Sequence, residues 1–206
     1  MMKKVVIIGN GGHAKVIKDV INAQGEFILA GYLDNNIDNY YEESGCFYDN
    51  LSHLERYRND YYFIIAIGNN KVRAQIFEQS NIAIKQFAKM IHPTAIISPY
   101  SEIGYGTVVM PNAVVNADTV IGEHVIINTS AVVEHDNRIG DYVHISPGAM
   151  LAGGVSVGRQ THVAIGAKVI PQINIGQDCV IGAGATVIND IESYQTVVGT
   201  PAISKE

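Results

Sequence analysis

The chain has 206 residues, of which 47% are hydrophobic and 17% charged, so it can bury a core and is not disordered. Its formal net charge is −6, and an acidic surface repels phosphate backbones, so we do not expect nucleic acid as a partner. Cys46 and Cys179 form no C-x-x-C pair, so neither a disulfide framework nor a structural zinc site is expected. The start, MMKKVVIIGNGG, has too short an apolar run for a signal peptide or membrane span, which favours a cytoplasmic protein.

Strands and helices are predicted to alternate through the first part of the chain. The β-branched run KKVVIIG predicts a buried strand, and HAKVIKDVINAQ has apolar residues at helical spacing before Gly25 as a stop signal. FILAGYLD and YYFIIAIG predict two further strands, and NNKVRAQIFEQS predicts a helix capped by Asn69 or Asn70. This order is typical of a small Rossmann-like α/β domain with a parallel sheet, which we assign to residues 1–88.

A glycine-rich loop joins the first strand to the first helix. Gly9-x-Gly11-x-x-Ala14 matches a phosphate-binding pattern, and Asp34 follows at the end of the second strand. Glycines let a backbone approach a phosphate group, and the helix N-terminus favours its negative charge. The pattern fits a nucleotide diphosphate with one base, a dinucleotide, or glycines with only a structural role.

The carboxyl ends of the predicted strands should meet at one edge of the sheet, where open α/β sheets bind ligands. Gly68 and Asn69 follow the third strand and so belong at that edge, although capping of the next helix is an alternative role for Asn69. The residues expected to line one crevice are Gly11, Gly12, His13, Asp34, Asn35, Gly68 and Asn69.

From Ile91 the sequence repeats every six residues. An aliphatic residue opens each of seventeen consecutive blocks up to Val187 without an insertion, and the fifth position is mostly small or branched. This period predicts a hexapeptide β-helix, in which three blocks make one triangular coil of eighteen residues. A β-sandwich, the alternative fold, would not keep so strict a period.

The segment SAVVEHDNRIGDYVH interrupts the repeat with charged side chains and histidines. Residues eighteen apart should lie one strand spacing apart, which puts His135 below Gly153. Asp136 is expected to orient the His135 imidazole, whereas Glu134 should point to the opposite face of the strand. A general base beside an open backbone N–H suits attack on a thioester, because the N–H can stabilise the oxyanion.

The other histidines of the repeat have less specific settings. His144 and His162 are expected to stack on each other, whereas His92 and His124 are expected to be solvated surface residues. Some trimeric β-helices, which resemble the β-helical carbonic anhydrases, bind zinc through three histidines, but their close histidine pair is absent here. No metal is therefore expected.

The order of these parts resembles the bacterial sugar acetyltransferases of the sialic acid O-acetyltransferase family, including the enzymes that act on UDP-4-amino-4,6-dideoxy-sugars. GNGGHAKVI, YLDNN, AIGNNKVR and INTSAVVEHD…IGDYVHISPGA carry the resemblance, which covers essentially the whole chain, and VVGTPA resembles the family's C-terminal cap. It implies a left-handed parallel β-helix with this cap over residues 89–206. It also implies acetyl-CoA as co-substrate and a homotrimer with active sites between neighbouring subunits.

Residue roles follow from the resemblance by position. His135 resembles the family's general base, and Asp136 stands where an acidic residue, Glu in the best-known members, raises that base's basicity. His144 resembles the residue near the acetyl group, and Gly153 resembles the backbone donor to the thioester. The nucleotide-sugar pocket is matched by Gly11, Gly12, His13, Asp34, Asn35 and Gly68, with Asn35 where some members have a second Asp.

Coenzyme A should lie along the later coils. Ile165 and Ala183 fall where the family contacts the coenzyme A arm. Its phosphates need cations, and Arg159 and Lys168 are the nearest basic residues along the chain. The expected activity is N-acetylation of a UDP-linked 4-amino-4,6-dideoxy-sugar in glycan biosynthesis. The alternatives are O-acetylation of a sialic acid or polysaccharide precursor, and a nucleotide-sugar-binding scaffold without catalysis.

Overall fold

Five strands form the sheet of the N-terminal part, in the order β3-β4-β2-β1-β5. The computed structural model describes residues 2–205 and confirms the three strands and two helices that the sequence predicts there. The short strands β3 and β4 are not predicted, because runs of three and four residues show no clear alternation. The elements are β1 (Lys3–Ile8), α1 (Gly12–Gln24), β2 (Phe27–Leu33), β3 (Tyr41–Glu43), β4 (Cys46–Asp49), β5 (Tyr62–Ile65) and α2 (Asn70–Ser80), with 3-10 helices at Leu51–Arg56 and Ile84–Gln86.

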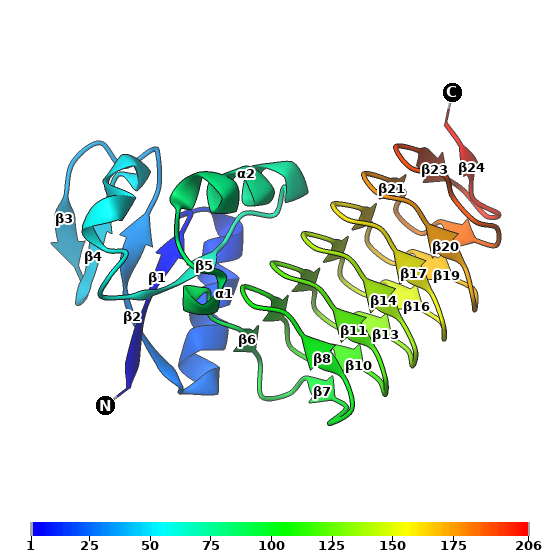
Figure 1. Ribbon diagram of the computed structural model, residues 1–206, viewed down its shortest axis with the longest axis horizontal. Coiled ribbons are helices and arrows are strands. Elements are labelled where there is room, and N and C mark those ends of the chain that lie inside the picture. The colour runs from blue at the N-terminus through cyan, green and yellow to red at the C-terminus, as the bar shows by residue number, and fades with distance from the viewer. Residues whose placement is uncertain (1, 206) are drawn as a thin grey trace.

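Helix α1 joins the sheet to the β-helix. Its buried side chains, among them Ala14, Ile17 and Ile21, lie on one face of the helix. They share a hydrophobic core with β1 and with Met90 and Val108 of the first coils, and Figure 1 shows α1 beside the start of the repeat. A continuous core, rather than a flexible linker, therefore connects the two parts of the chain.

The repeat forms a prism with three faces, each a sheet that takes one strand from every coil (Figure 1). The first face holds β6 (Met90–Ile91), β9 (Val108–Val109), β12 (Ile126–Ile127), β15 (His144–Ile145), β18 (His162–Val163), β21 (Val180–Ile181), β23 (Thr196–Val198) and the antiparallel β24 (Ile203–Ser204). The second face holds β7 (Ile96–Ile97), β10 (Val114–Val115), β13 (Val132–Val133), β16 (Met150–Leu151), β19 (Lys168–Val169) and β22 (Thr186–Val187). The third face holds β8 (Glu102–Ile103), β11 (Val120–Ile121), β14 (Arg138–Ile139), β17 (Ser156–Val157) and β20 (Asn174–Ile175).

Strand register confirms the predicted coil of eighteen residues, since His144 pairs with His162. The second residue of each strand points inward, and from Val109 to Val187 these aliphatic side chains are buried in the prism. Tight turns separate the faces. We call the turn from the first to the second face corner one, that from the second to the third corner two, and that from the third back to the first corner three.

His124, at corner three, is buried, so the expectation of a solvated surface histidine is wrong. Its ring stacks on Tyr142 with 5.4 Å between centroids and packs against Phe77 and Phe87 at 4.7 Å. Neither ring nitrogen has a hydrogen-bond partner among residues 2–205. Burial, helped by the charge of Arg73, lowers the pKa of His124 to about 3. His124 is buried because α2 and the segment before β6 cover this corner.

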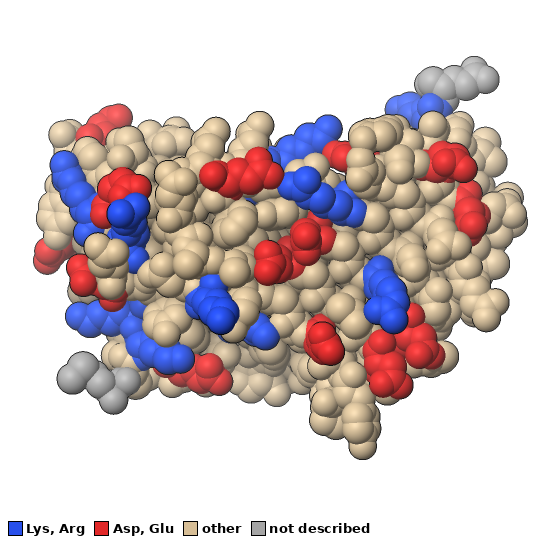
Figure 2. Space-filling model, in the orientation of Figure 1, with Lys and Arg blue, Asp and Glu red and all other residues tan. Residues whose placement is uncertain are grey.

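Charged side chains are scattered over the face drawn in Figure 2, with acidic and basic groups interspersed. That face therefore offers no concentrated basic patch to a nucleic acid. No helix within residues 2–205 has the length and apolarity needed to cross a bilayer. In the same residues, no group of three or more His, Cys, Asp or Glu side chains is arranged to hold a metal ion.

Candidate active site

Corner two carries the two side chains that the sequence singles out. His135 Nδ1 and Asp136 Oδ2 lie 2.7 Å apart, and both side chains are more than half exposed. This hydrogen bond raises the pKa of His135 above its ordinary value. Because the carboxylate accepts a hydrogen bond from Nδ1–H, Nε2 carries the lone pair and can take a proton from a substrate. Glu134 instead accepts a hydrogen bond from Asn116 Nδ2 at 2.8 Å.

Gly153 lies directly above His135 in the next coil, which confirms the predicted stacking. A Cβ built on Gly153 would come 2.6 Å from His135 Cε1 and 2.7 Å from Nε2. Any side chain at this position would displace the imidazole, so glycine is required for the ring to stay where it is. The predicted role of the Gly153 N–H, as a donor to the thioester oxygen, stays a prediction.

A cavity of about 410 Å³ opens at the carboxyl ends of β1, β2 and β5, where the nucleotide crevice is predicted. A Cβ on any of its glycines would meet no atom within 4 Å, so the protein's own packing does not require glycine there. Helix α1 also begins at this cavity without a side-chain cap, which leaves its N-terminus open to an anion. Of the seven predicted residues, five line the cavity: Gly11, Gly12, His13, Asp34 and Gly68.

Asp34 shapes the rim of this cavity. Its carboxylate accepts hydrogen bonds from the backbone N–H of Asn10 at 2.7 Å and of Asn36 at 2.8 Å. Asn10 and Asn36 line the cavity, but the sequence did not single them out. Asn35 instead lines a neighbouring hollow of about 420 Å³ between the first 3-10 helix and α2. Loop residues of this kind point one way or the other according to turn geometry, which spacing does not reveal.

A second cavity, of about 540 Å³, lies where the loop after β5 meets the first face of the β-helix. Gly68 lines both this cavity and the nucleotide cavity, so the two adjoin. Asn69 lines it too, and its side chain also caps α2 by accepting from the N–H of Val72 at 3.1 Å. His144 and His162 form the β-helical wall, with their rings stacked 5.0 Å apart.

The histidines around the two adjoining cavities are neutral at neutral pH. Burial, followed by the neighbouring His162, lowers the pKa of His144 to about 3. Asn128 Nδ2 lies 3.0 Å from His144 Nε2, so Nε2 accepts and the ring proton is on Nδ1. Burial also lowers the pKa of His13 to about 4. The predicted site residues His13 and His144 therefore offer neutral rings.

The residues predicted to bind coenzyme A separate into two groups. Ile165 and Ala183 are exposed at corner one, and the Ile165 carbonyl accepts from the N–H of Gly184, which stacks the two turns. Lys168 is exposed on the neighbouring second face. Arg159 lies at corner three instead, where its Nη2 donates to Glu78 of α2 at 2.9 Å. The structure thus does not bring Arg159 together with the other three.

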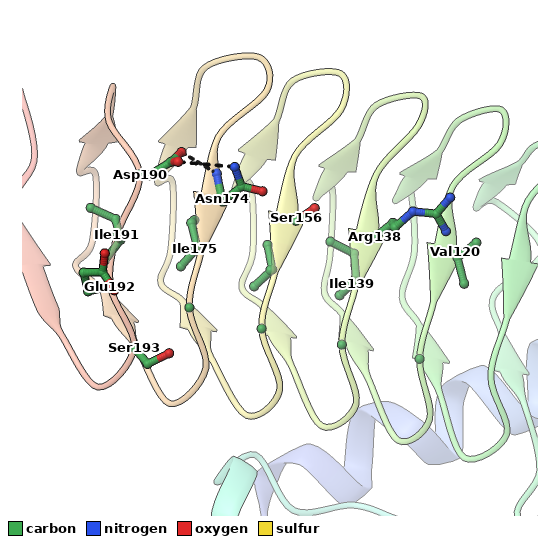
Figure 3. A pocket seen from close by; sticks show the side chains of 15 residues that line it. Val120, Arg138, Ile139, Ser156, Asn174, Ile175, Asp190, Ile191, Glu192 and Ser193 are labelled. Atoms are coloured by element: carbon green, nitrogen blue, oxygen red, sulfur yellow. Dashed lines mark hydrogen bonds between the residues drawn. The ribbon is translucent and has the colours of Figure 1, made fainter.

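A groove of about 610 Å³ runs along the third face, and no predicted site residue lines it (Figure 3). Figure 3 shows Arg138, Ser156 and Asn174 on successive coils at its edge. Four stacked glycines form its floor, and a Cβ on each would come within 2.8 Å of the next coil's backbone: Gly122, Gly140, Gly158 and Gly176. Close stacking of the coils therefore accounts for this stripe.

Within one chain, the His135–Asp136 pair and the nucleotide cavity lie on different sides of the prism. His135 belongs to corner two, whereas α2 is fixed to corner three. Arg73 Nε donates to the carbonyl of His124 at 2.8 Å, and Asn70 Nδ2 donates to that of Gln160 at 2.9 Å. A ligand beside Gly68 therefore faces His144 of the same chain and not His135.

A parallel-sheet domain with an open helix N-terminus, fused to a hexapeptide β-helix with a histidine–carboxylate pair, is the architecture of a hexapeptide-repeat transferase. The family model of the PglD N-terminal domain matches residues 4–80, and that of the bacterial transferase hexapeptide (six repeats) matches residues 118–153. The chain belongs to the sugar acetyltransferases that join these two domains. The predicted family is thereby confirmed, and so is the fold class, a small Rossmann-like domain followed by a left-handed parallel β-helix.

The solved structures that match along the whole chain include two complexes with CoA or acetyl coenzyme A. One is a histidine-to-asparagine mutant of perosamine N-acetyltransferase from Caulobacter crescentus in complex with CoA and GDP-perosamine. It is 36% identical, with a TM-score of 0.91, over 100% of this chain and 98% of that chain. The other is the acetyltransferase domain of PglB from Neisseria gonorrhoeae FA1090 in complex with acetyl coenzyme A. It is 34% identical, with a TM-score of 0.90, over 100% of both chains.

A curated relative matches over part of its length. UDP-N-acetylbacillosamine N-acetyltransferase of Bacillus subtilis (strain 168) is 47% identical over 113 residues. This alignment covers 53% of the present chain and 52% of the relative, so it spans about half the length of that protein.

Proposed function

We propose that this protein transfers the acetyl group of acetyl-CoA to the amino group of a nucleotide-linked 4-amino-4,6-dideoxy-sugar in bacterial glycan biosynthesis. The His135–Asp136 pair beneath Gly153 carries the proposal, because it supplies a base beside a backbone donor. The family indicates the substrates, since its solved members include complexes with CoA and GDP-perosamine and with acetyl coenzyme A. Residues 1–88 bind the nucleotide sugar, and residues 89–206 bind acetyl-CoA.

The first cavity suits the diphosphate of the sugar nucleotide. Its glycines leave backbone N–H groups accessible, and the α1 N-terminus attracts negative charge. From there the sugar extends past Gly68 into the second cavity, towards His144. The nucleotide base stays open: the relatives include enzymes named for UDP-linked and for GDP-linked sugars, and we retain the UDP sugar as the first choice.

Acetyl transfer is direct, through a tetrahedral intermediate and without an acetylated enzyme. His135 Nε2 takes a proton from the sugar amine while the amine nitrogen attacks the thioester carbonyl carbon. The Gly153 N–H donates to the oxyanion of the tetrahedral intermediate, and Asp136 stabilises the imidazolium. The C–S bond then breaks, and the coenzyme A thiolate leaves and receives the proton from His135. Much of the rate comes from holding the two substrates in contact.

The active site requires a second copy of the chain, and we propose a homotrimer in the cytoplasm. The second face carries an outward row of apolar side chains, of which Ile96 is 65% and Met150 48% exposed. Burying three such faces around a threefold axis brings corner two of one chain to corner one of the next. His135 of one subunit then meets Ile165 and the first face, with His144, of its neighbour.

Acetyl-CoA turnover on defined acceptors tests this function. The purified protein is incubated with acetyl-CoA and with UDP- and GDP-linked 4-amino-4,6-dideoxy-sugars, or with sialic acid. Thiol release and the mass gain of one acetyl group are measured for each acceptor. We expect transfer only to a nucleotide-linked amino sugar. Transfer to a sialic acid hydroxyl would replace the proposed acceptor, and binding of a nucleotide sugar without any thiol release would indicate a scaffold.

A further inference from the structure

Arg73, on α2, is a buried cation that the proposed chemistry does not use. Its side chain is 1% exposed and lies between the N-terminal part and the β-helix. Nε donates to the carbonyl of His124 at 2.8 Å, and Nη2 donates to that of Tyr142 at 2.7 Å. Nη1 donates to the carbonyls of Ile67 at 2.9 Å and Gly68 at 3.3 Å. One guanidinium therefore ties the loop at the nucleotide cavity to two successive coils of the β-helix.

Asn70 extends this connection to a third coil. Its Oδ1 accepts from Arg73 Nη2 at 2.9 Å, and its Nδ2 donates to the carbonyls of Gln160 at 2.9 Å and Thr161 at 3.1 Å. The two side chains, which we call the Arg73–Asn70 latch, thus contact corner three at positions 124, 142 and 160. These positions are stacked eighteen residues apart, so the latch sets the height of the loop along the prism axis.

Neutral carbonyl and amide oxygens are the only hydrogen-bond acceptors that Arg73 has within residues 2–205. Burial lowers the pKa of Arg73 to about 9, which still leaves it charged at neutral pH. Burying a cation without a carboxylate partner costs free energy. The planar guanidinium of Arg73 has five N–H donors, which allows it to reach several carbonyls at once. Lysine, with three donors on one nitrogen, cannot span the same acceptors.

We propose that Arg73, held by Asn70, is a positioning residue for acetyl transfer, because it fixes the Gly68 loop and the sugar beside it against the coil that carries His144. This inference rests on the proposed function, since Gly68 lines both the nucleotide cavity and the cavity in front of His144. A misplacement of about 1 Å between reacting groups can cost on the order of 100-fold in rate. The latch therefore determines the rate without touching either substrate.

The pKa of His144 gives a measure of the Arg73–Asn70 latch that does not depend on enzymatic activity. The charged or titratable groups that face it are His162, His13, Arg73 and, across the second cavity, Lys71 and Asp178. The Arg73 charge is one of the contributions that hold the pKa of His144 down, after burial and His162. Removing that charge should raise the pKa, whereas replacing Arg by Lys should keep most of the effect.

The test compares Arg73→Lys, Arg73→Met and the control Arg58→Lys, whose exposed side chain pairs with Glu55 at the surface. We expect kcat/KM for the nucleotide sugar to fall about 100-fold in both Arg73 variants, with the KM for acetyl-CoA unchanged. The NMR titration of the His144 ring, assigned with His144→Asn, should shift upward in Arg73→Met but not in Arg73→Lys. Calorimetric affinity for UDP or GDP should weaken in both.

Three outcomes are decisive. Folded Arg73 variants with control-like kcat/KM, nucleotide affinity and His144 titration would overturn the inference. If those variants do not fold, Asn70→Ala decides, since it removes the third coil's contact and keeps the Arg73 bonds to Gly68. For Asn70→Ala, a fall in kcat/KM that is smaller than the fall of about 100-fold expected for the Arg73 variants supports the latch. An unchanged kcat/KM in Asn70→Ala overturns the inference. A wild-type protein that acetylates no sugar overturns the proposed function alone, because nucleotide affinity and the His144 titration still test Arg73.

Discussion

His135 and Asp136 are two exposed residues whose proposed catalytic role depends on one hydrogen bond between them. Asp136 has a left-handed backbone with φ of 59°, a conformation that Asp tolerates better than most residues. From that turn its short side chain still reaches His135 Nδ1 at 2.7 Å. The Asp found here, in place of the Glu of the best-known family members, is therefore long enough to orient the ring.

Substitutions of His135 and Asp136 should distinguish the effect of losing the base from the effect of losing the carboxylate. His135→Ala should lower kcat by about 10²–10⁴-fold while acetyl-CoA still binds. Because Asp136 raises the pKa of His135, Asp136→Asn should lower that pKa, shift the acidic limb of the rate profile to lower pH, and reduce kcat less. Rate profiles between pH 5 and 9 check this with both variants. Wild-type kcat in His135→Ala would refute the catalytic role and make His144 the next candidate.

Gly153→Ala tests the space above the ring. The new Cβ would collide with the imidazole, an exposed and movable side chain, so the ring should swing away from Asp136 at little cost to stability. We expect kcat to fall about 10²-fold or more and the melting temperature to change little. The control is Gly45→Ala in the turn between β3 and β4, whose Cβ meets no atom within 4 Å although its backbone is left-handed. Equal loss of activity in both variants would contradict the proposed contact.

At the scale of elements, the packing of α2 against corner three makes the fold sensitive to acid. The folded-state pKa of His124, about 3, lies below the ordinary 6.5. Below pH 6.5 the unfolded chain therefore binds a proton that the folded chain does not, and stability falls as the pH drops. The contribution is about 1.4 kcal/mol per pH unit, or about 2 kcal/mol between pH 6.5 and pH 5.

His124→Leu should remove this contribution, together with two buried nitrogens that have no partner. Urea unfolding at pH 7 and pH 5, at fixed protein concentration, should show a smaller loss of stability in the variant. His13 and His144 act in the same direction, so part of the acid sensitivity should remain. A variant that loses as much stability as the wild type would show that His124 gains its proton in the folded state.

Lys168 on β19 and Arg159 at corner three are the two cations predicted to bind the phosphates of coenzyme A. Lys168→Ala should raise the KM for acetyl-CoA about two- to fivefold with little change in kcat, as expected when uniform binding is lost. Arg159→Ala should have a smaller effect on that KM, because its guanidinium pairs with Glu78. Steady-state kinetics of the single variants decide between them. An unchanged KM in both would place the coenzyme A phosphates in solvent.

Local patterns predicted most of these elements, and long-range packing accounts for what they missed. The period of six fixes which residues of the repeat point inward and which stack, so the positions of His135, Gly153 and His144 follow from arithmetic. The burial of His124 and the role of Arg73 depend on α2 lying across corner three, which no spacing within the repeat encodes. The run AIGNNKVR contains Arg73, but nothing in its spacing marks that residue as buried.

The whole molecule is predicted to work only as an assembly, and mixed trimers test this directly. His135→Ala lacks the base, and Asp34→Ala should lack an ordered nucleotide loop. Each homotrimer should be inactive. Subunits mixed at equal amounts and reassembled should recover about one quarter of wild-type activity, because each site is proposed to take its base from one chain and its pocket from the next. No recovery in trimers shown to be mixed would place both halves of the site in one chain.

The unbroken register of the coils also constrains how the length of the gene can change. Each coil hydrogen-bonds to the next at a fixed offset, so deleting a single codon within the repeat would turn every later inward side chain outward. Gain or loss of eighteen codons, one full coil, keeps every later residue at its place in the prism. Such a coil can be added towards the C-terminus, but not between the coils of His135 and Gly153, where it would put a different residue above the imidazole.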